Sequence, residues 1–332
     1  MAAVLAQERL LRRSALAAGA AFFMVSPAAR AQGEYPSRPL RFVTSGTPGS
    51  VSDILPRLIS PEMEKLLGQP VVVENRPGGS GLVSASAVMG APPDGYTLLI
   101  AAVGTMAVNP HVIPRMPFDP ARDFQGLALI ASMPLVLVVG SEAPVQDVQG
   151  LLATAKAQPG TISYGSVGAG SSANIAGAIL AHGAGLELIH VPYSGYSQAV
   201  AELMAGRLSC MFVDFGTALG QIRQGGLRPL AVSTADRSDL LPDVPTMREL
   251  GHEMDVTLWY GAYVRPGAPA AASRQLGAVM TQVIRKPEIR QKLAAYGLRP
   301  GDLFGEDFQT FHLAELARWG KALPALGIQT SN

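Results

Sequence analysis

Two short segments rich in glycine and serine carry the residue types that could bind a small anion. The first, at residues 45–50, reads Ser-Gly-Thr-Pro-Gly-Ser, and the second, at residues 165–172, reads Gly-Ser-Val-Gly-Ala-Gly-Ser-Ser. Glycine lets the backbone approach a ligand closely, and the hydroxyl groups of serine and threonine add hydrogen-bond donors. Both segments therefore predict binding by backbone amides and hydroxyl groups.

Each segment lies between a predicted strand and a predicted helix. Residues 40–44 are apolar, and residues 52–67 repeat apolar side chains at helical spacing; residues 162–164 and 172–182 flank the second segment in the same way. The first turn of a helix presents unpaired N–H groups and about half a positive charge. Ligands of open α/β sheets bind beyond the carboxyl ends of the strands. We expect each segment to hold one side of an anion, although a capped βα turn is the alternative for either segment alone.

Asp214 is a third candidate. It follows an apolar strand predicted at residues 208–212, so it lies at the carboxyl end of that strand. Its carboxylate could accept a hydrogen bond from an amine or hydroxyl of the ligand, or it could cap the following helix. Both roles stay open at this point.

Predicted strands and helices alternate along two halves of the chain, which is typical of α/β folds with parallel sheets covered by helices. The alternation starts again after Ser132, and from about Ala270 the chain is mainly helical. We expect this helical tail to pack on the first half. The predicted domains are residues 32–132 with 256–332, and residues 133–255, joined by strands that cross near Ser132 and Val256.

Composition excludes several classes of protein. The chain has 332 residues, of which 48% are apolar and 15% charged, so it is long enough for two domains with cores of their own. Its 26 basic and 25 acidic residues leave no excess positive charge for binding a nucleic acid. Cys210 is the sole cysteine, which excludes an internal disulfide and a cysteine-rich metal site.

The N-terminus has the layout of a secretory signal peptide. Three arginines precede an apolar stretch at residues 15–25, and small residues at positions 29 and 31 define a cleavage site after Ala31. We therefore expect residues 1–31 to be removed and the protein to reach the periplasm. A short core helix is the alternative, and the adjacent arginines at 12 and 13 leave the twin-arginine export route open.

An exported serine-dependent hydrolase or esterase, using Ser166 or Ser171, is the alternative function. A serine nucleophile needs a positioned histidine, and the five histidines are far apart in the sequence. The spacing of glycines at residues 168–173 fits a loose dinucleotide-binding pattern, but an exported protein meets little NAD. We expect a binding protein without catalytic activity, metal or cofactor.

Six short motifs occur in order along the chain. They are YPSRP at 35–39, VENRPG at 73–78, PDGYTL at 93–98, YGSVG at 164–168, VPYSG at 191–195 and PDVPT at 242–246. Together they resemble the Bug-type periplasmic solute-binding proteins of tripartite tricarboxylate transporters, over residues 35 to about 327.

The resemblance implies a two-domain venus-flytrap α/β fold that closes over a small carboxylate. It places the first ligand loop at residues 45–53, the second at 165–172, and the VPYSG motif near the same cleft. It also implies a monomer that delivers its ligand to membrane permease subunits, with a signalling partner as the alternative and no nucleic acid as a partner. Family members usually have proline and an aromatic residue where this chain has Ser45 and Gly46. The missing ring predicts a wider or more polar wall.

The residues that we expect to bind the ligand are therefore Ser45, Gly46, Thr47, Gly49, Ser50, Gly165, Ser166, Gly168, Ser171, Ser172, Tyr193, Gly195 and Asp214.

Overall fold

The computed structural model describes residues 35–326. The chain divides into Met1–Ser37 and Arg38–Asn332, and the account below concerns the second of these units. The expected signal peptide at residues 1–31 lies outside the described residues. Within residues 35–326, no helix has both the length and the apolar character needed to cross a membrane.

The strands follow one path of hydrogen-bonded neighbours, in the order β2-β1-β3-β9-β4-β7-β5-β6, while β10 and β8 also pair with β4. Two pairing regions share β4, and we call them sheet A and sheet B. Sheet A contains β1 (Leu40–Thr44), β2 (Val71–Asn75), β3 (Thr97–Ala102), β9 (Thr257–Val264), β10 (Arg299–Pro300) and the first part of β4 (Gln125–Gly140). Sheet B contains the second part of β4 with β5 (Ser163–Ser166), β6 (Ile189–Pro192), β7 (Cys210–Asp214) and β8 (Leu227–Val232).

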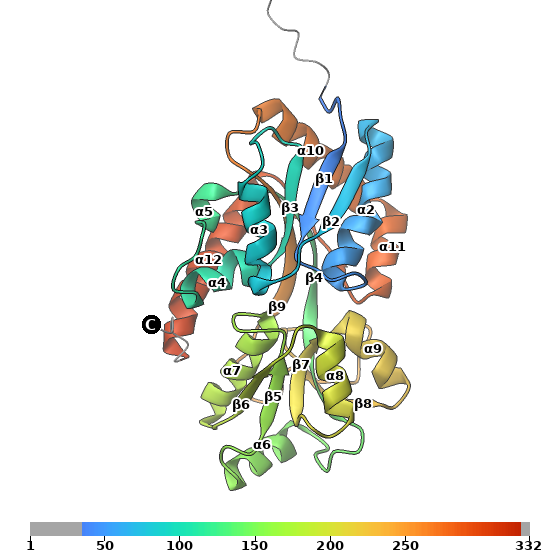
Figure 1. Cartoon of the computed structure of the whole chain (residues 1–332). Helices are drawn as coiled ribbons and strands as arrows, with labels where there is room; N and C mark the ends of the chain where they lie inside the picture. The colour runs from blue at the N-terminus through green and yellow to red at the C-terminus, as the bar shows by residue number, and fades with distance from the viewer. Residues whose placement is uncertain (1–34, 327–332) are drawn as a thin grey trace, which may run out of the picture. The chain divides into compact units, whose positions relative to one another are not determined.

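β4 passes from one sheet to the other without a break (Figure 1). Pro134 is its last residue paired with β9, and Leu135 is its first residue paired with β7. The alternation expected to start again after Ser132 therefore begins in the middle of one long strand. The expectation of purely parallel sheets is wrong, because β9 runs antiparallel to β3 and β4, and β4 runs antiparallel to β7 and β8. None of these antiparallel pairs joins strands that are consecutive in the chain, so the rule that one helical crossover makes successive strands parallel does not apply to them.

Helices flank both sheets (Figure 1). With sheet A are α2 (Val51–Leu67), η1 (Gly79–Gly81), α3 (Leu82–Met89), the π-helix η2 (Gly104–Val108), α4 (Asn109–Val112), α5 (Pro120–Asp123), α10 (Ala270–Ile284), α11 (Pro287–Ala295) and α12 (Glu306–Ala325). With sheet B are α6 (Val148–Ala157), α7 (Ser172–Ala184), α8 (Tyr196–Met204) and α9 (Phe215–Arg223).

α2 is one continuous helix although it contains Pro56 and Pro61. Pro56 has no N–H to donate to the carbonyl of Ser52 four residues earlier. The hydroxyl of Thr44, at the end of β1, donates to that carbonyl instead, at 2.9 Å. Gly68 ends the helix in the left-handed conformation, with φ 66°, as its position in the sequence predicts. The first turn of α2 is thus fixed to the end of β1.

The C-terminal helices pack on sheet A and its helices: α10 and α11 lie against α2, and α12 lies against β4 and η2. Aromatic rings fill this interface, where Trp259 and Tyr263 of β9 meet Phe308 of α12. His312 of α12 is fully buried, and its Nε2 is 3.1 Å from the carbonyl oxygen of Met106 in η2. α12 therefore fixes the position of η2, one wall of the site described next.

Candidate functional site

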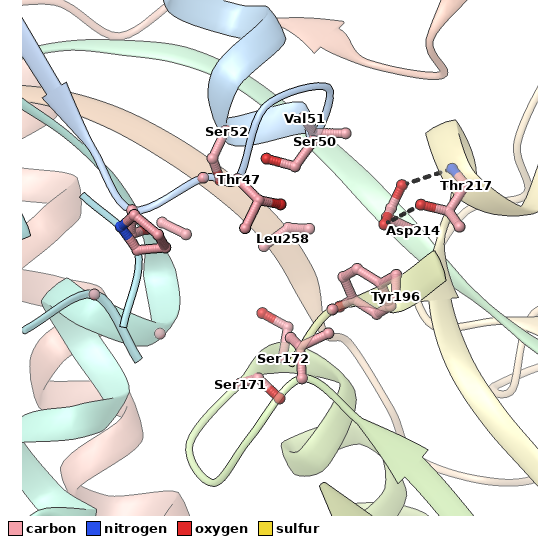
Figure 2. A pocket seen from close by; sticks show the side chains of 18 of the residues that line it. Thr47, Ser50, Val51, Ser52, Ser171, Ser172, Tyr196, Asp214, Thr217 and Leu258 are labelled. Carbon is pink, nitrogen blue, oxygen red and sulfur yellow. Dashed lines mark hydrogen bonds between the residues drawn. The ribbon is translucent and has the colours of Figure 1, made fainter. Parts of the chain in front are cut away.

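A cavity of about 1210 Å³ lies where loops from the two sheets face one another. We call residues 45–50, which join β1 to α2, the α2 loop, and residues 167–171, which join β5 to α7, the α7 loop. Figure 2 shows Thr47 and Ser50 on one side of the space and Ser171 and Ser172 on the other. The first residues of α8 and α9 also line the cavity. The two segments predicted to bind an anion are thus brought together.

The α2 loop leaves a hydroxyl group free at the start of α2. Ser50 is the N-cap residue, but its side chain makes no capping hydrogen bond. Asp53 takes part of this role, since its Oδ2 accepts from the Gly49 N–H at 2.9 Å. The Ser50 hydroxyl is buried and has no partner in the described part of the chain. It lines the cavity beside the unpaired N–H groups of the first helical turn.

Asp53 holds the α2 loop in place. Burial acts to raise the pKa of this carboxyl, but hydrogen bonds from Gly49, Asn75 and Arg57 together lower it below its usual value. The Asn75 amide donates to Asp53 Oδ1 and to the Gly46 carbonyl, both at 2.8 Å. Asp53 is therefore an ionised anchor of the loop and does not line the cavity.

A second free hydroxyl lies at the start of α7, directly after the α7 loop. Ser171 caps α7, because its Oγ accepts from the Asn174 N–H at 3.3 Å and donates to the Gly168 carbonyl at 2.7 Å. Gly168 and Gly170 have φ angles of 111° and 73°, which favour glycine. Ser172 is only 4% exposed, and its hydroxyl has no partner among residues 35–326. A buried polar atom without a partner is costly, so this hydroxyl requires a ligand or water.

A third glycine-rich segment, residues 78–81, also lines the cavity. The sequence interpretation missed this segment. The Ser80 carbonyl accepts from Asn109 Nδ2 at 2.8 Å and from Thr105 Oγ1 at 3.1 Å. Asn109 is fully buried, and its Oδ1 has no partner within the described residues. The Gly-Gly-Ser-Gly segment also lies between a strand and a helix, so the rule that found the other two loops could have found it. No pattern in the sequence around Asn109 indicated that this residue would line the cavity.

Nine of the thirteen predicted ligand-binding residues line the cavity. They are Ser45, Gly46, Thr47, Gly49, Ser50, Ser171, Ser172, Gly195 and Asp214. Gly165, Ser166, Gly168 and Tyr193 lie outside the lining, so the structure does not support a direct contact for these four.

The structure explains why each of these four residues lies outside the cavity lining. Gly165 and Ser166 belong to β5, where the sheet surrounds them. The Gly168 backbone faces Ser80, since a Cβ on Gly168 would be 3.4 Å from Ser80 Oγ. Tyr193 packs against the apolar core of sheet B. Tyr196, the first residue of α8, lines the cavity in its place.

Ser166 has a histidine neighbour, so the expectation that no histidine is positioned beside it is wrong. Its Oγ lies 2.6 Å from Nε2 of His190 on the adjacent strand β6. Burial lowers the pKa of His190, whose ring stacks on Tyr164 with 5.1 Å between centroids. The Ser166 side chain is fully buried outside the cavity lining, so a substrate in the cavity does not reach it.

Asp214 has the capping role that the sequence left open, and its ligand-binding role stays a prediction, with its place in the lining in favour. Its two carboxylate oxygens accept from the Thr217 N–H at 2.9 Å and the Thr217 hydroxyl at 3.0 Å, which caps α9 (Figure 2). Asp214 is 3% exposed and also lines the cavity. Burial raises the pKa of this carboxyl, while the hydrogen bonds from Thr217 act in the opposite direction.

Gly46 lies against the first turn of α2. A Cβ at this position would lie 2.6 Å from Ser50 Oγ and 2.7 Å from Ser52 Cβ, so this loop conformation has no room for a side chain there. The expectation of a wider or more polar wall than in other family members stays a prediction.

Charged side chains are scarce around the cavity. Within the described residues, its lining contains no lysine, arginine or histidine, and Asp214 is its one acidic residue. An anion bound here would be stabilised by backbone N–H groups, hydroxyl groups and the dipoles of α2 and α7. A dry site makes such fixed dipoles effective, because the local dielectric constant is low.

Comparisons with known proteins agree with this geometry. A family model described as "Tripartite tricarboxylate transporter family receptor" matches residues 55–328. Protein BugT of Bordetella pertussis is 29% identical over 295 residues, which cover 88% of this chain and 90% of BugT.

Two solved structures resemble this one closely. Rpa4515 of R. palustris, solved with adipate, is 32% identical with a TM-score of 0.85, and the match covers 90% of this chain and all of that one. The periplasmic binding protein BugD is 24% identical with a TM-score of 0.82, over 90% of this chain and all of that one. The fold is therefore the α/β fold of these binding proteins, as the sequence motifs implied.

Proposed function

Because the chain belongs to the tripartite tricarboxylate transporter receptor family, we propose that it is a periplasmic binding protein that captures a small organic carboxylate in the cavity between sheets A and B. Family membership confirms the resemblance drawn from the six motifs. The adipate in the solved relative supports a carboxylate as the class of ligand.

The observation that carries this proposal is the pair of buried, unpartnered hydroxyl groups at the facing starts of α2 and α7. Ser50 Oγ and Ser172 Oγ both line the cavity, and each begins a helix whose first N–H groups lack intrahelical partners. A hydrogen bond to a charged group contributes about 1.5–3 kcal/mol. Four or five such bonds to a carboxylate suffice for micromolar affinity, about −8 kcal/mol, even after ordering costs.

Thermal melting with a panel of mono- and dicarboxylic acids tests the proposal. A ligand that binds the folded protein raises the melting temperature in line with RT ln(1 + [L]/Kd). Ser172→Ala should weaken binding about tenfold or more, because one hydrogen bond to a charge is lost. Ser86→Ala, an exposed serine of α3 outside the cavity, is the matched control.

Two outcomes would contradict the proposal. One is a melting temperature that no acid raises. The other is conversion of a bound acid into product, which would favour a hydrolase. Native mass spectrometry of the purified protein separates the two, because it gives the mass of a bound acid before and after incubation.

We infer further that residues 1–31 are a signal peptide cleaved after Ala31 and that the protein acts without catalysis. Membrane permease subunits are the proposed recipients of the ligand. Mass spectrometry of the exported protein tests the cleavage site, since removal after Ala31 leaves Gln32 as the first residue.

The proposed domains are residues 32–132 with 256–332, and residues 133–255. The change of partners along β4 between Pro134 and Leu135 supports this division. In this proposal the domains close over the ligand by bending at the crossing strands, as in hinge-type domain closure.

A further inference from the structure

The α9 side of the cavity carries negative charge and no compensating cation. Within the described residues, Asp214 is the one acidic residue of the cavity lining, and this lining contains no lysine, arginine or histidine. Although burial raises the pKa of Asp214, the two hydrogen bonds from Thr217 and the N-terminus of α9 favour its ionised form. A group that enters this side of the cavity therefore faces an anion held at the start of α9.

Packing contacts place Asp214 close to the α2 side of the cavity. A Cβ on Gly216, two residues after Asp214, would lie 3.2 Å from Val51 Cγ2 at the start of α2. Figure 2 shows Asp214 and Thr217 to one side of Ser50 and Ser172, with Tyr196 between Ser172 and Asp214 in this view. A ligand carboxylate held by the two loops therefore directs another part of the molecule toward Asp214.

The groups around Asp214 are neutral hydrogen-bonding groups. Burial raises the pKa of Tyr196 and of Tyr260, and the charge of Asp214 is the second largest cause of the same shift. Both phenols therefore stay protonated. Both tyrosines line the cavity, together with the amides of Gln198 and Gln221. This side can donate and accept hydrogen bonds, but its described lining has no basic side chain to neutralise a second carboxylate beside Asp214.

We propose that the ligand carries one carboxylate, held by the α2 and α7 loops, and presents a hydroxyl or ammonium group rather than a second carboxylate toward Asp214. This inference rests on the proposed function. Two like charges repel strongly in a site from which water is excluded. A hydroxyl or ammonium donor instead forms a charge-assisted hydrogen bond with a carboxylate.

Asn109 gives independent support. Its Oδ1 is a second acceptor in the lining, fully buried and without a partner in residues 35–326. Its Nδ2 already donates to the Ser80 carbonyl, so the amide cannot turn without losing that bond. A ligand rich in donors satisfies this oxygen, whereas a dicarboxylate whose groups are all acceptors does not.

The test compares linear acids of matched length by isothermal titration calorimetry. One series consists of dicarboxylates from succinate to suberate, and the other of the corresponding ω-hydroxy and ω-amino monocarboxylates. The wild-type protein should bind the best hydroxy or amino acid at least about tenfold more tightly than the dicarboxylate of equal length, a difference of about 1.4 kcal/mol.

Asp214→Asn removes the charge and keeps a residue that caps helices well. It should reduce that preference about tenfold, mainly by strengthening the binding of the dicarboxylate. Asp243→Asn, at an exposed residue outside the lining, should leave the preference unchanged.

Dicarboxylates that bind as tightly as their hydroxy and amino counterparts to the wild-type protein would overturn the inference and leave the proposed function intact. The same holds if Asp214→Asn folds and leaves the preference unchanged. If the wild-type protein bound no acid of either series, the proposed function itself would fail. Because the wild-type comparison needs no variant, the inference stays testable even if Asp214→Asn does not fold.

Discussion

At the scale of single residues, serines of similar sequence context have different roles. Ser50 and Ser172 expose unpartnered hydroxyl groups to the cavity, whereas Ser166 is bonded to His190 behind it. Sequence patterns could not separate these serines, because all lie in or beside a glycine-rich turn. What distinguishes them is whether the fold already satisfies the hydroxyl.

Ser166→Ala should therefore destabilise the fold and leave ligand binding nearly unchanged. The substitution removes the hydrogen-bond partner of the half-buried His190 ring, which costs about 1–3 kcal/mol. Chemical denaturation measures this loss, and titration with a bound acid measures the affinity. A loss of affinity without a loss of stability would contradict this prediction and would indicate that Ser166 contacts the ligand.

The same pair predicts a dependence of stability on pH. Burial lowers the pKa of His190 in the folded protein below that of the unfolded chain, about 6.5. The folded state then binds fewer protons, so this contribution to stability is complete above about pH 6.5 and falls as the pH drops toward the folded pKa. His190→Gln should make the denaturation midpoint less sensitive to pH over this interval.

At the scale of elements, close backbone contact joins η2 to the α7 loop. A Cβ on Gly104 would lie 3.1 Å from the Gly170 carbonyl oxygen and 3.8 Å from the Ser171 Cα. Ser80 Oγ adds a hydrogen bond to the Ala169 carbonyl at 3.3 Å. These contacts link an element of sheet A to a loop of sheet B at the rim of the cavity.

Gly104→Ala should weaken ligand binding by about tenfold while the melting temperature without ligand changes little. The added methyl group would separate η2 from the α7 loop, and a displacement of this kind moves Ser171 and Ser172 away from the ligand. Gly183→Ala in α7, where a Cβ meets nothing within 4 Å, is the control. Unchanged affinity in Gly104→Ala would show that the cavity does not depend on this contact.

Local sequence patterns predicted most elements but not their pairing. The strand expected at residues 40–44 matches β1, and the helix expected at residues 52–67 matches α2 to within one residue. The antiparallel direction of β9 depends on where the chain crosses between the two sheets. The periodicity of side chains within a strand does not predict where this crossing occurs. Tyr193 and Tyr196 both pack against the apolar core of sheet B, and Tyr196 also lines the cavity. The sequence pattern carried no signal that distinguishes these two rings.

At the scale of the whole binding unit, the cavity depends on the junction between the two sheets, which share β4. β4 pairs with the start of β9 up to the junction at Pro134. Directly after it, the Ser233 hydroxyl bonds to the Leu135 N–H at 2.9 Å and to the Val256 carbonyl at 2.6 Å. The proposed closing motion must bend the chain near these bonds. Residues in the described lining come from both sides of this junction.

Binding of a carboxylate should therefore reduce the radius of gyration. Ligand contacts with both loops favour the closed state, and the population shifts by the difference in affinity between the two states. Small-angle X-ray scattering with and without a saturating acid measures this change. Equal radii in the two conditions would argue for a cavity that is closed before the ligand arrives.

The scarcity of charged side chains around the cavity also bears on how ligand binding responds to the ionic strength of the solution. Dissolved ions screen exposed charges over about 8–10 Å at physiological ionic strength, but they act weakly on dipoles fixed in a buried site. Capture by amides and hydroxyls at the starts of α2 and α7 should thus keep its strength when the salinity of the surroundings rises and falls, whereas a receptor built on surface arginines would lose affinity.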